Sequence, residues 1–141
     1  MEFLRDYIDL IIFLILGIMA FIALWCVIER LLFFRKIDFK NYKNQEEFDN
    51  AVSENLTAIY IIYSNAPYIG LLGTVVGIMV TFYEMGLAGN IDVKSIVVGL
   101  SLALKATALG LLVAIPTLIA YNVLLRKISL LSSTYKANQN D

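Results

Sequence analysis

"GLSLALKATALGLLVAIP", residues 99–116, is a run of small and aliphatic side chains that contains a single charged residue, Lys105. The run lies inside a longer segment, 95–125, that has no other charge. This segment exceeds the roughly 20 apolar residues that a helix needs to cross a hydrocarbon core of about 30 Å. It predicts a membrane-spanning helix and raises the question of how the charge of Lys105 is accommodated.

The composition supports a membrane protein and excludes several classes of function. The chain is 60% hydrophobic and 16% charged, which is far more apolar than a soluble domain. Its 11 basic and 12 acidic residues nearly cancel, so nothing indicates a nucleic-acid partner. With no histidine and one cysteine, we expect no metal site and no cofactor. No nucleophile, base and orienting group occur together, so we expect no catalytic residue and no enzyme.

Two further uncharged segments, 10–28 and 56–83, predict two more membrane helices. Asn65 and Pro67 interrupt the second segment, which predicts a kink or the start of its membrane-embedded part. We therefore expect an all-α, polytopic fold divided as follows: 1–9 periplasmic N-terminus, 10–28 first span, 29–65 cytoplasmic loop and beginning of the second helix, 66–83 second span, 84–94 periplasmic connection, 95–116 third span, and 117–141 cytoplasmic helix extension and tail.

The basic residues predict the orientation. Eight of them lie in 29–65 or beyond 116, whereas only Arg5 and Lys94 lie at the opposite ends of the spans. Because cytoplasmic segments keep the excess of lysine and arginine, the first loop and the C-terminus should be cytoplasmic and the N-terminus should lie outside. The charged segment between Glu29 and Glu54 should form a polar loop in water that continues as amphipathic helix at both ends. The second and third helices are longer than a bilayer requires and should extend into the cytoplasm. Self-association would bury their apolar surfaces.

Lys105 should lie near the bilayer midplane, where an ammonium group costs about 3 kcal/mol. No aspartate or glutamate lies inside the three predicted spans, and the nearest are Glu29, Glu84 and Asp92 at their edges. A buried counter-ion would then come from another chain. Two simpler interpretations stay open: the lysine can extend toward an interface along its own stem, or it can lose its proton.

Helical spacing separates the polar from the small side chains of the second and third helices. Lys105 and Thr107 point about 200° apart, so both cannot face the centre of one pore. For the threonines, a hydroxyl bond to the carbonyl four residues back is the alternative to a functional role. The residues predicted to allow close helix packing are Gly70, Gly73, Gly77, Ala103 and Gly110.

Two blocks carry a resemblance to a known family: "NAPYIGLLGTVVGIMVTF", residues 65–82, and "LALKATALGLLVAIPTLIAYNVLLRKI", residues 102–128. They resemble the MotA/TolQ/ExbB family of bacterial proton-channel and motor subunits, and are closest to ExbB and TolQ. The shared features include the Ala-Pro at 66–67, Gly-Thr-Val at 73–75, Ala-Thr-Ala at 106–108 and Val-Ala-Ile-Pro at 113–116.

The resemblance implies a homopentamer in the bacterial inner membrane. Its second and third helices would line a pore that holds an ExbD- or TolR-like partner, whose single-span helix carries a proton-accepting aspartate. The motion would pass to the outer membrane through a TonB- or TolA-like protein. Thr74 and Thr107 align with polar pore threonines of the family, and Thr81 and Lys105 complete the predicted proton pathway.

The chain departs from the family pattern at Leu102, where the family usually carries a glutamate. We hypothesise that Lys105, one turn later, replaces that glutamate and holds the partner's aspartate ionised by opposite charge. An alternative role for Lys105 is a strut between subunits.

The functional hypotheses come from different classes. An ExbB-like subunit would energise TonB-dependent transport across the outer membrane, whereas a TolQ-like subunit would maintain the envelope through the Tol-Pal system. A non-conducting scaffold would need only the glycine faces. A small-solute transporter is poorly supported because the chain has no internal repeat and no pair of broken helices.

Overall fold

The computed structural model describes residues 2–139, with side chains from Arg5 onward. This part of the chain contains helices and no strands, as the sequence predicts. The elements in chain order are α1 (Glu2–Lys36), the short 3-10 helix η1 (Phe39–Asn41), α2 (Gln45–Val52), α3 (Leu56–Ala88) and α4 (Val93–Gln139).

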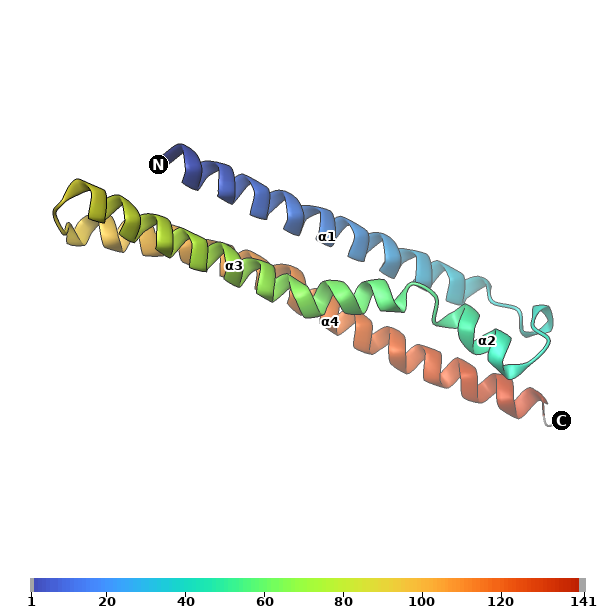
Figure 1. Cartoon of the computed structure of the whole chain (residues 1–141). Coiled ribbons are helices and arrows are strands. Elements are labelled where there is room, and N and C mark those ends of the chain that lie inside the picture. Colours follow the sequence, from blue (N-terminus) through green and yellow to red (C-terminus); the bar gives the residue numbers. More distant parts are fainter. Residues whose placement is uncertain (1, 140–141) are drawn as a thin grey trace.

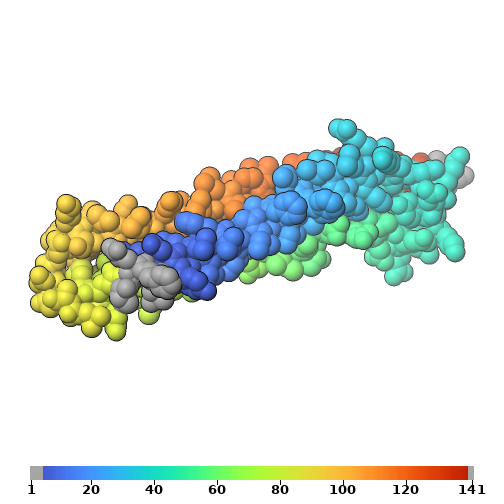
Figure 2. Space-filling model, turned by 90° about the horizontal axis from the view of Figure 1, so that it is seen from above, coloured from blue at the N-terminus to red at the C-terminus, as the bar shows by residue number. Residues whose placement is uncertain are grey.

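Three long helices form an elongated bundle (Figure 1). The connection between α3 and α4 lies at the same end as the N-terminus, and α2 lies beside the C-terminal part of α4 at the other end. Seen from above, α1 lies over the seam between α3 and α4 (Figure 2). The seam between α3 and α4 is therefore covered on one side by α1.

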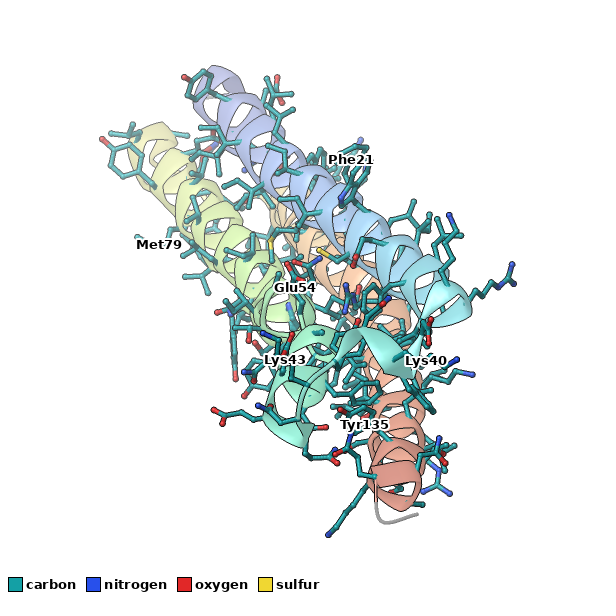
Figure 3. All side chains as sticks on the ribbon, turned by 90° about the vertical axis from the view of Figure 1, so that its right-hand side faces the viewer. Phe21, Lys40, Lys43, Glu54, Met79 and Tyr135 are labelled. Carbon is teal, nitrogen blue, oxygen red and sulfur yellow. The ribbon has the colours of Figure 1, made fainter. Side chains whose placement is uncertain are left out.

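The long helices have the length and composition of membrane spans. Within the described part of the chain, three helical segments meet this criterion: Arg5–Lys36, Leu56–Ala88 and Val93–Gln139. Large apolar side chains such as Phe21 and Met79 project away from the bundle on different sides (Figure 3) and are about two-thirds exposed. Such a surface suits lipid or neighbouring subunits rather than water. The chain is a multi-pass membrane protein.

Helix α3 continues through Asn65 and Pro67, where the sequence predicts a kink or the beginning of the embedded part. Local side chains contribute hydrogen bonds in this turn: Asn65 donates to the carbonyl of Ile61 at 2.8 Å, and Ser64 donates to that of Tyr60 at 2.7 Å. The helix ends where Gly89 adopts a left-handed conformation with φ of 76°, which glycine accepts without a steric penalty. Helix α4 likewise continues through Pro116.

The region predicted as a polar loop contains a buried aromatic cluster. Phe48 of α2 stacks on Tyr135 of α4 with ring centroids 4.3 Å apart, and Phe39 and Tyr42 meet Phe48 edge-on at 5.3 and 5.2 Å. Tyr135 lies beside α2 (Figure 3) and donates its hydroxyl to the carbonyl of Tyr42 at 3.0 Å. The aromatic residues alternate with charged ones along the chain, so composition alone hides them.

Arg30 joins this aromatic cluster to α1. Its side chain is 1% exposed and donates to the carbonyls of Ala51 and Val52 at 2.7 and 3.1 Å. These are the last carbonyls of α2, which have no partner within their own helix. Glu29 holds the other side of the guanidinium through two contacts of 2.6 Å. Arg30 thus closes the end of α2 with a charged side chain from α1.

Candidate functional site

The candidate site lies in the seam where α3 and α4 approach closely. A Cβ added at Gly70 would lie 2.5 Å from the carbonyl oxygen of Ala106, and one added at Gly110 would lie 2.6 Å from that of Ala66. Glycine therefore permits contact between the two backbones, as in tightly packed membrane helices. Side chains on either edge of this contact are held at a fixed separation.

The seam continues with similarly close contacts between α3 and α4 toward the end of the bundle where the N-terminus lies. A Cβ at Gly73 would meet the methyl group of Ala106 at 2.8 Å, and one at Gly77 would meet that of Ala103 at 2.8 Å. The structure thus places the small residues predicted for packing, Gly70, Gly73, Gly77, Ala103 and Gly110, in one continuous seam.

Thr74 and Thr107 meet across this seam. Thr74 is 6% exposed and donates its hydroxyl to the carbonyl of Ala103 at 2.8 Å, and the hydroxyls of Thr74 and Thr107 are in hydrogen-bond contact. Because a hydroxyl has one proton, Thr107 is then the donor to Thr74. The carbonyl of Gly70, four residues back, is 3.4 Å from the Thr74 hydroxyl. The bond across the seam is therefore shorter than the local one that the sequence offered as an alternative.

Thr81 is in a separate environment, two turns from Thr74 on α3. Its buried hydroxyl donates to the carbonyl of Gly77 at 2.9 Å and accepts from Arg5 of α1 at 2.7 Å. The packed contact of Gly77 with Ala103 lies between Thr81 and Thr74. The structure therefore does not join these two hydroxyls through the seam.

Lys105 lies outside the seam. Its side chain is exposed and its ammonium nitrogen is 5.6 Å from the centre of the Phe13 ring on α1. The carboxylate of Asp9, one turn before Phe13, lies within electrostatic range of Lys105. Sequence reasoning assigned Asp9 to the periplasmic N-terminus and so missed it as a neighbour of the lysine.

The four residues predicted for a proton pathway thus fall into three places. Thr74 and Thr107 form one hydroxyl pair, Thr81 binds Arg5, and Lys105 faces α1. Sequence reasoning used Arg5 only for the orientation and missed its contact with Thr81; its position five residues before the first uncharged segment was the available signal. Among residues 5–139, no three His, Cys, Asp or Glu side chains gather into a possible metal site.

The model of the MotA/TolQ/ExbB proton channel family matches residues 36–137, which include α3 and nearly all of α4. The chain belongs to this family. The membership confirms the resemblance carried by residues 65–82 and 102–128. The matched region contains the Thr74–Thr107 pair and starts at the last residue of α1.

Curated relatives include "Biopolymer transport protein ExbB" of Helicobacter pylori J99, which is 58% identical over 136 residues, covering 96% of this chain and 94% of the relative. The protein of the same name from Aquifex aeolicus is 48% identical over 128 residues, covering 91% of this chain and 86% of that protein. A more distant ExbB protein, from Neisseria gonorrhoeae, is 40% identical over 86 residues, or 61% of this chain and 39% of the relative. The MotA/TolQ/ExbB chain described here is thus similar to ExbB proteins over most of its length.

Proposed function

We propose that this chain is an ExbB-like subunit of a proton channel that uses the proton-motive force to energise TonB-dependent transport across the outer membrane. The family match and the ExbB names of its relatives support this role. The observation that carries the proposal is the buried Thr74–Thr107 hydroxyl pair in the matched region. The chain acts as a channel and motor subunit rather than as an enzyme.

The two hydroxyls offer a polar step in an apolar environment. Each hydroxyl can donate one proton and accept another, and the carbonyl of Ala103 supplies a fixed acceptor beside them. The seam itself provides no carboxylate to take up the proton. An ExbD-like partner with an aspartate in its single membrane helix supplies that group, and the threonines contact it as it enters and leaves the pore.

The exposed apolar faces of α3 and α4 support assembly into a homopentamer. Side chains such as Leu72, Phe82 and Leu112 are more than half exposed. Packing of neighbouring subunits covers these faces and places α3 and α4 around a central pore. In this arrangement the complex lies in the bacterial inner membrane, with the N-terminus periplasmic and the α2 region cytoplasmic, in agreement with the basic residues of that region.

Proton flux into liposomes tests the proposal. The complex is purified after co-expression with its ExbD-like partner, and acidification is followed with an internal pH-sensitive dye. We expect flux that requires the partner, is lost when the partner's aspartate is neutralised, and falls about fivefold in Thr74→Val, since one hydrogen bond is worth about 1 kcal/mol. The matched control is Thr117→Val, because Thr117 donates only to the carbonyl of Val113 in its own helix at 2.7 Å.

Two results would contradict the proposal. Absence of flux from the intact complex, with normal assembly, favours the non-conducting scaffold. Flux that is insensitive to Thr74→Val and to the partner's aspartate means that protons cross elsewhere. Restoration of TonB-dependent growth in a strain that lacks its own ExbB distinguishes the ExbB-like role from the TolQ-like one.

A further inference from the structure

The beginning of α1 carries two opposite charges on one helical face. Arg5 and Asp9 are four residues apart, which places their side chains on neighbouring turns. The family match begins only at residue 36, so it assigns no role to either residue. Each of them faces a different helix of the channel pair α3 and α4.

Arg5 is directed toward α3. Its guanidinium donates to the Thr81 hydroxyl at 2.7 Å and lies 3.5 Å from the carboxylate of Glu84. The side chains of Arg5 and Glu84 are only 15% and 27% exposed. Gly99 of α4 leaves no room for a side chain against Thr81, so the threonine is fixed between the arginine and α4. The contact with Arg5 therefore sets the position of α1 on α3.

Asp9 precedes Phe13 by one turn of α1 and so shares the helix face that meets Lys105 of α4. The Phe13 ring lies under the ammonium group of Lys105, at 5.6 Å from the ring centre. The positive charges of Arg5 and Lys105 and the negative charge of Asp6 all act on the carboxylate of Asp9. Lys105 and Asp9 interact through space rather than through a direct bond. The aromatic face and the carboxylate are both favourable for a cation.

We propose that Lys105, Asp9, Arg5 and Glu84 form an alternating four-charge network that fastens α1 across α3 and α4, with Asp9 as the counter-ion of Lys105 within the same chain. The network consists of positioning residues: it holds in register the two helices whose Thr74 and Thr107 hydroxyls meet. Its effect on proton flux rests on the proposed function, whereas its effect on packing does not.

The balance of charge gives the network a specific signature. Within the network each cation lies near an anion, in surroundings where an unpaired charge is costly. Removal of Lys105 or Asp9 alone changes the net charge of the region by one unit. Removal of both leaves the net charge unchanged, so the double variant should be less perturbed than either single variant.

The test is a double-mutant cycle with Lys105→Met, Asp9→Asn and the combination, in the complex purified with its partner in nanodiscs. Thermal unfolding and proton flux are both measured. We expect each single variant to lower Tm by about 3 °C or more and flux by about tenfold, and the double variant to recover most of both losses. Lys127→Met combined with Asp9→Asn is the matched control, because Lys127 is an exposed lysine of α4 about six turns beyond Lys105, and it should give no recovery.

Additive losses in the double variant would overturn the proposal. Loss of flux in Lys105→Met without a change in Tm, together with an unaffected Asp9→Asn, would also overturn it and assign Lys105 to the partner's aspartate. If the single variants do not assemble, the exchange Asp9→Lys with Lys105→Asp tests the same pair, and its failure to assemble counts against the network. An intact complex that does not conduct refutes the proposed function alone, because the Tm cycle still measures the coupling.

Discussion

Substitution of Gly70 by alanine tests whether backbone contact between α3 and α4 sets the geometry of the candidate site. The added Cβ would lie 2.5 Å from the carbonyl oxygen of Ala106 and 3.1 Å from the Cα of Gly110. Both neighbours are backbone atoms, so rotation of a side chain cannot relieve the contact. The helices themselves must separate.

The required displacement follows from the contact distance. Ordinary van der Waals contact begins at 3.4 Å, so the helices must separate by about 0.9 Å near Gly70. Thr74 lies one turn away, and its 2.8 Å bond to the carbonyl of Ala103 would lengthen to about 3.7 Å, beyond hydrogen-bond range. The substitution therefore strains the packing and breaks the bond that orients Thr74.

The energetic terms give a net loss of stability. Overpacking costs about 1 to 3 kcal/mol and the lost hydrogen bond about 1 kcal/mol. Alanine recovers about 0.5 to 1 kcal/mol relative to glycine inside a helix. The sum is a destabilisation of about 1 to 3.5 kcal/mol, which corresponds to a fall in Tm of about 3 to 10 °C for a chain of this size.

Thermal unfolding of the purified complex in nanodiscs, with proton flux as a second measurement, provides the assay. Gly86→Ala is the matched control on the same helix, because a Cβ there meets nothing within 4 Å. The control should unfold at the same temperature as the unaltered chain or slightly higher. If Gly70→Ala is as stable and as conductive as Gly86→Ala, close contact does not define the seam and the reasoning fails.

Three further substitutions probe the aromatic cluster around Phe48 and the Thr117 side chain of α4. Arg30→Gln should destabilise the chain by about 3 kcal/mol, because it leaves the last carbonyls of α2 and Glu29 without their buried cation, and limited proteolysis should then cleave within 37–55. Phe48→Ala should cost about 3 to 5 kcal/mol through loss of the stack on Tyr135, measured by thermal unfolding. Thr117→Val should change stability by less than about 0.5 kcal/mol, because its bond stays within one helix.

Each of these predictions has a result that contradicts it. Unchanged proteolysis in Arg30→Gln would mean that α2 is held by its aromatic residues alone. A loss of less than about 1 kcal/mol in Phe48→Ala would mean that the cluster collapses around the missing ring. A large loss in Thr117→Val would indicate that this hydroxyl has a partner in the assembled complex.

The helices could be predicted from the sequence because each long apolar segment strongly favours one secondary structure. A backbone surrounded by hydrocarbon must satisfy its own hydrogen bonds, so the uncharged runs around Gly17, Gly73 and Gly110 all become helical. The family resemblance implied that Thr74 and Thr107 are both pore threonines, but it did not predict that their hydroxyls meet. Spacing alone could not decide whether each hydroxyl bonds within its helix or across the seam.

The contributions of α1 to the site could not be predicted in this way. The neighbours of Arg5 and Asp9 depend on how far α1 is displaced along α3 and α4, and hydropathy does not encode that displacement. The same limit applies to Phe48 and Tyr135, which are separated by most of the chain and meet because α2 folds back onto α4. Short-range patterns describe elements, whereas these contacts depend on how the elements are placed.

The placement of α1 also explains why Lys105 and Thr107 of α4 have different surroundings, a point that the sequence could not decide. Ile12 and Leu16 of α1 pack against Ala106, so this alanine marks the side of the seam that α1 covers. In a helix, Lys105 and Thr107 diverge by about 100° in opposite directions from Ala106. Lys105 turns to the flank of α1, where Phe13 lies beside it, and Thr107 turns across the seam to Thr74. In the proposed assembly, a pore lined by α3 and α4 would meet the hydroxyl pair from the side that α1 leaves open, while the lysine stays with α1.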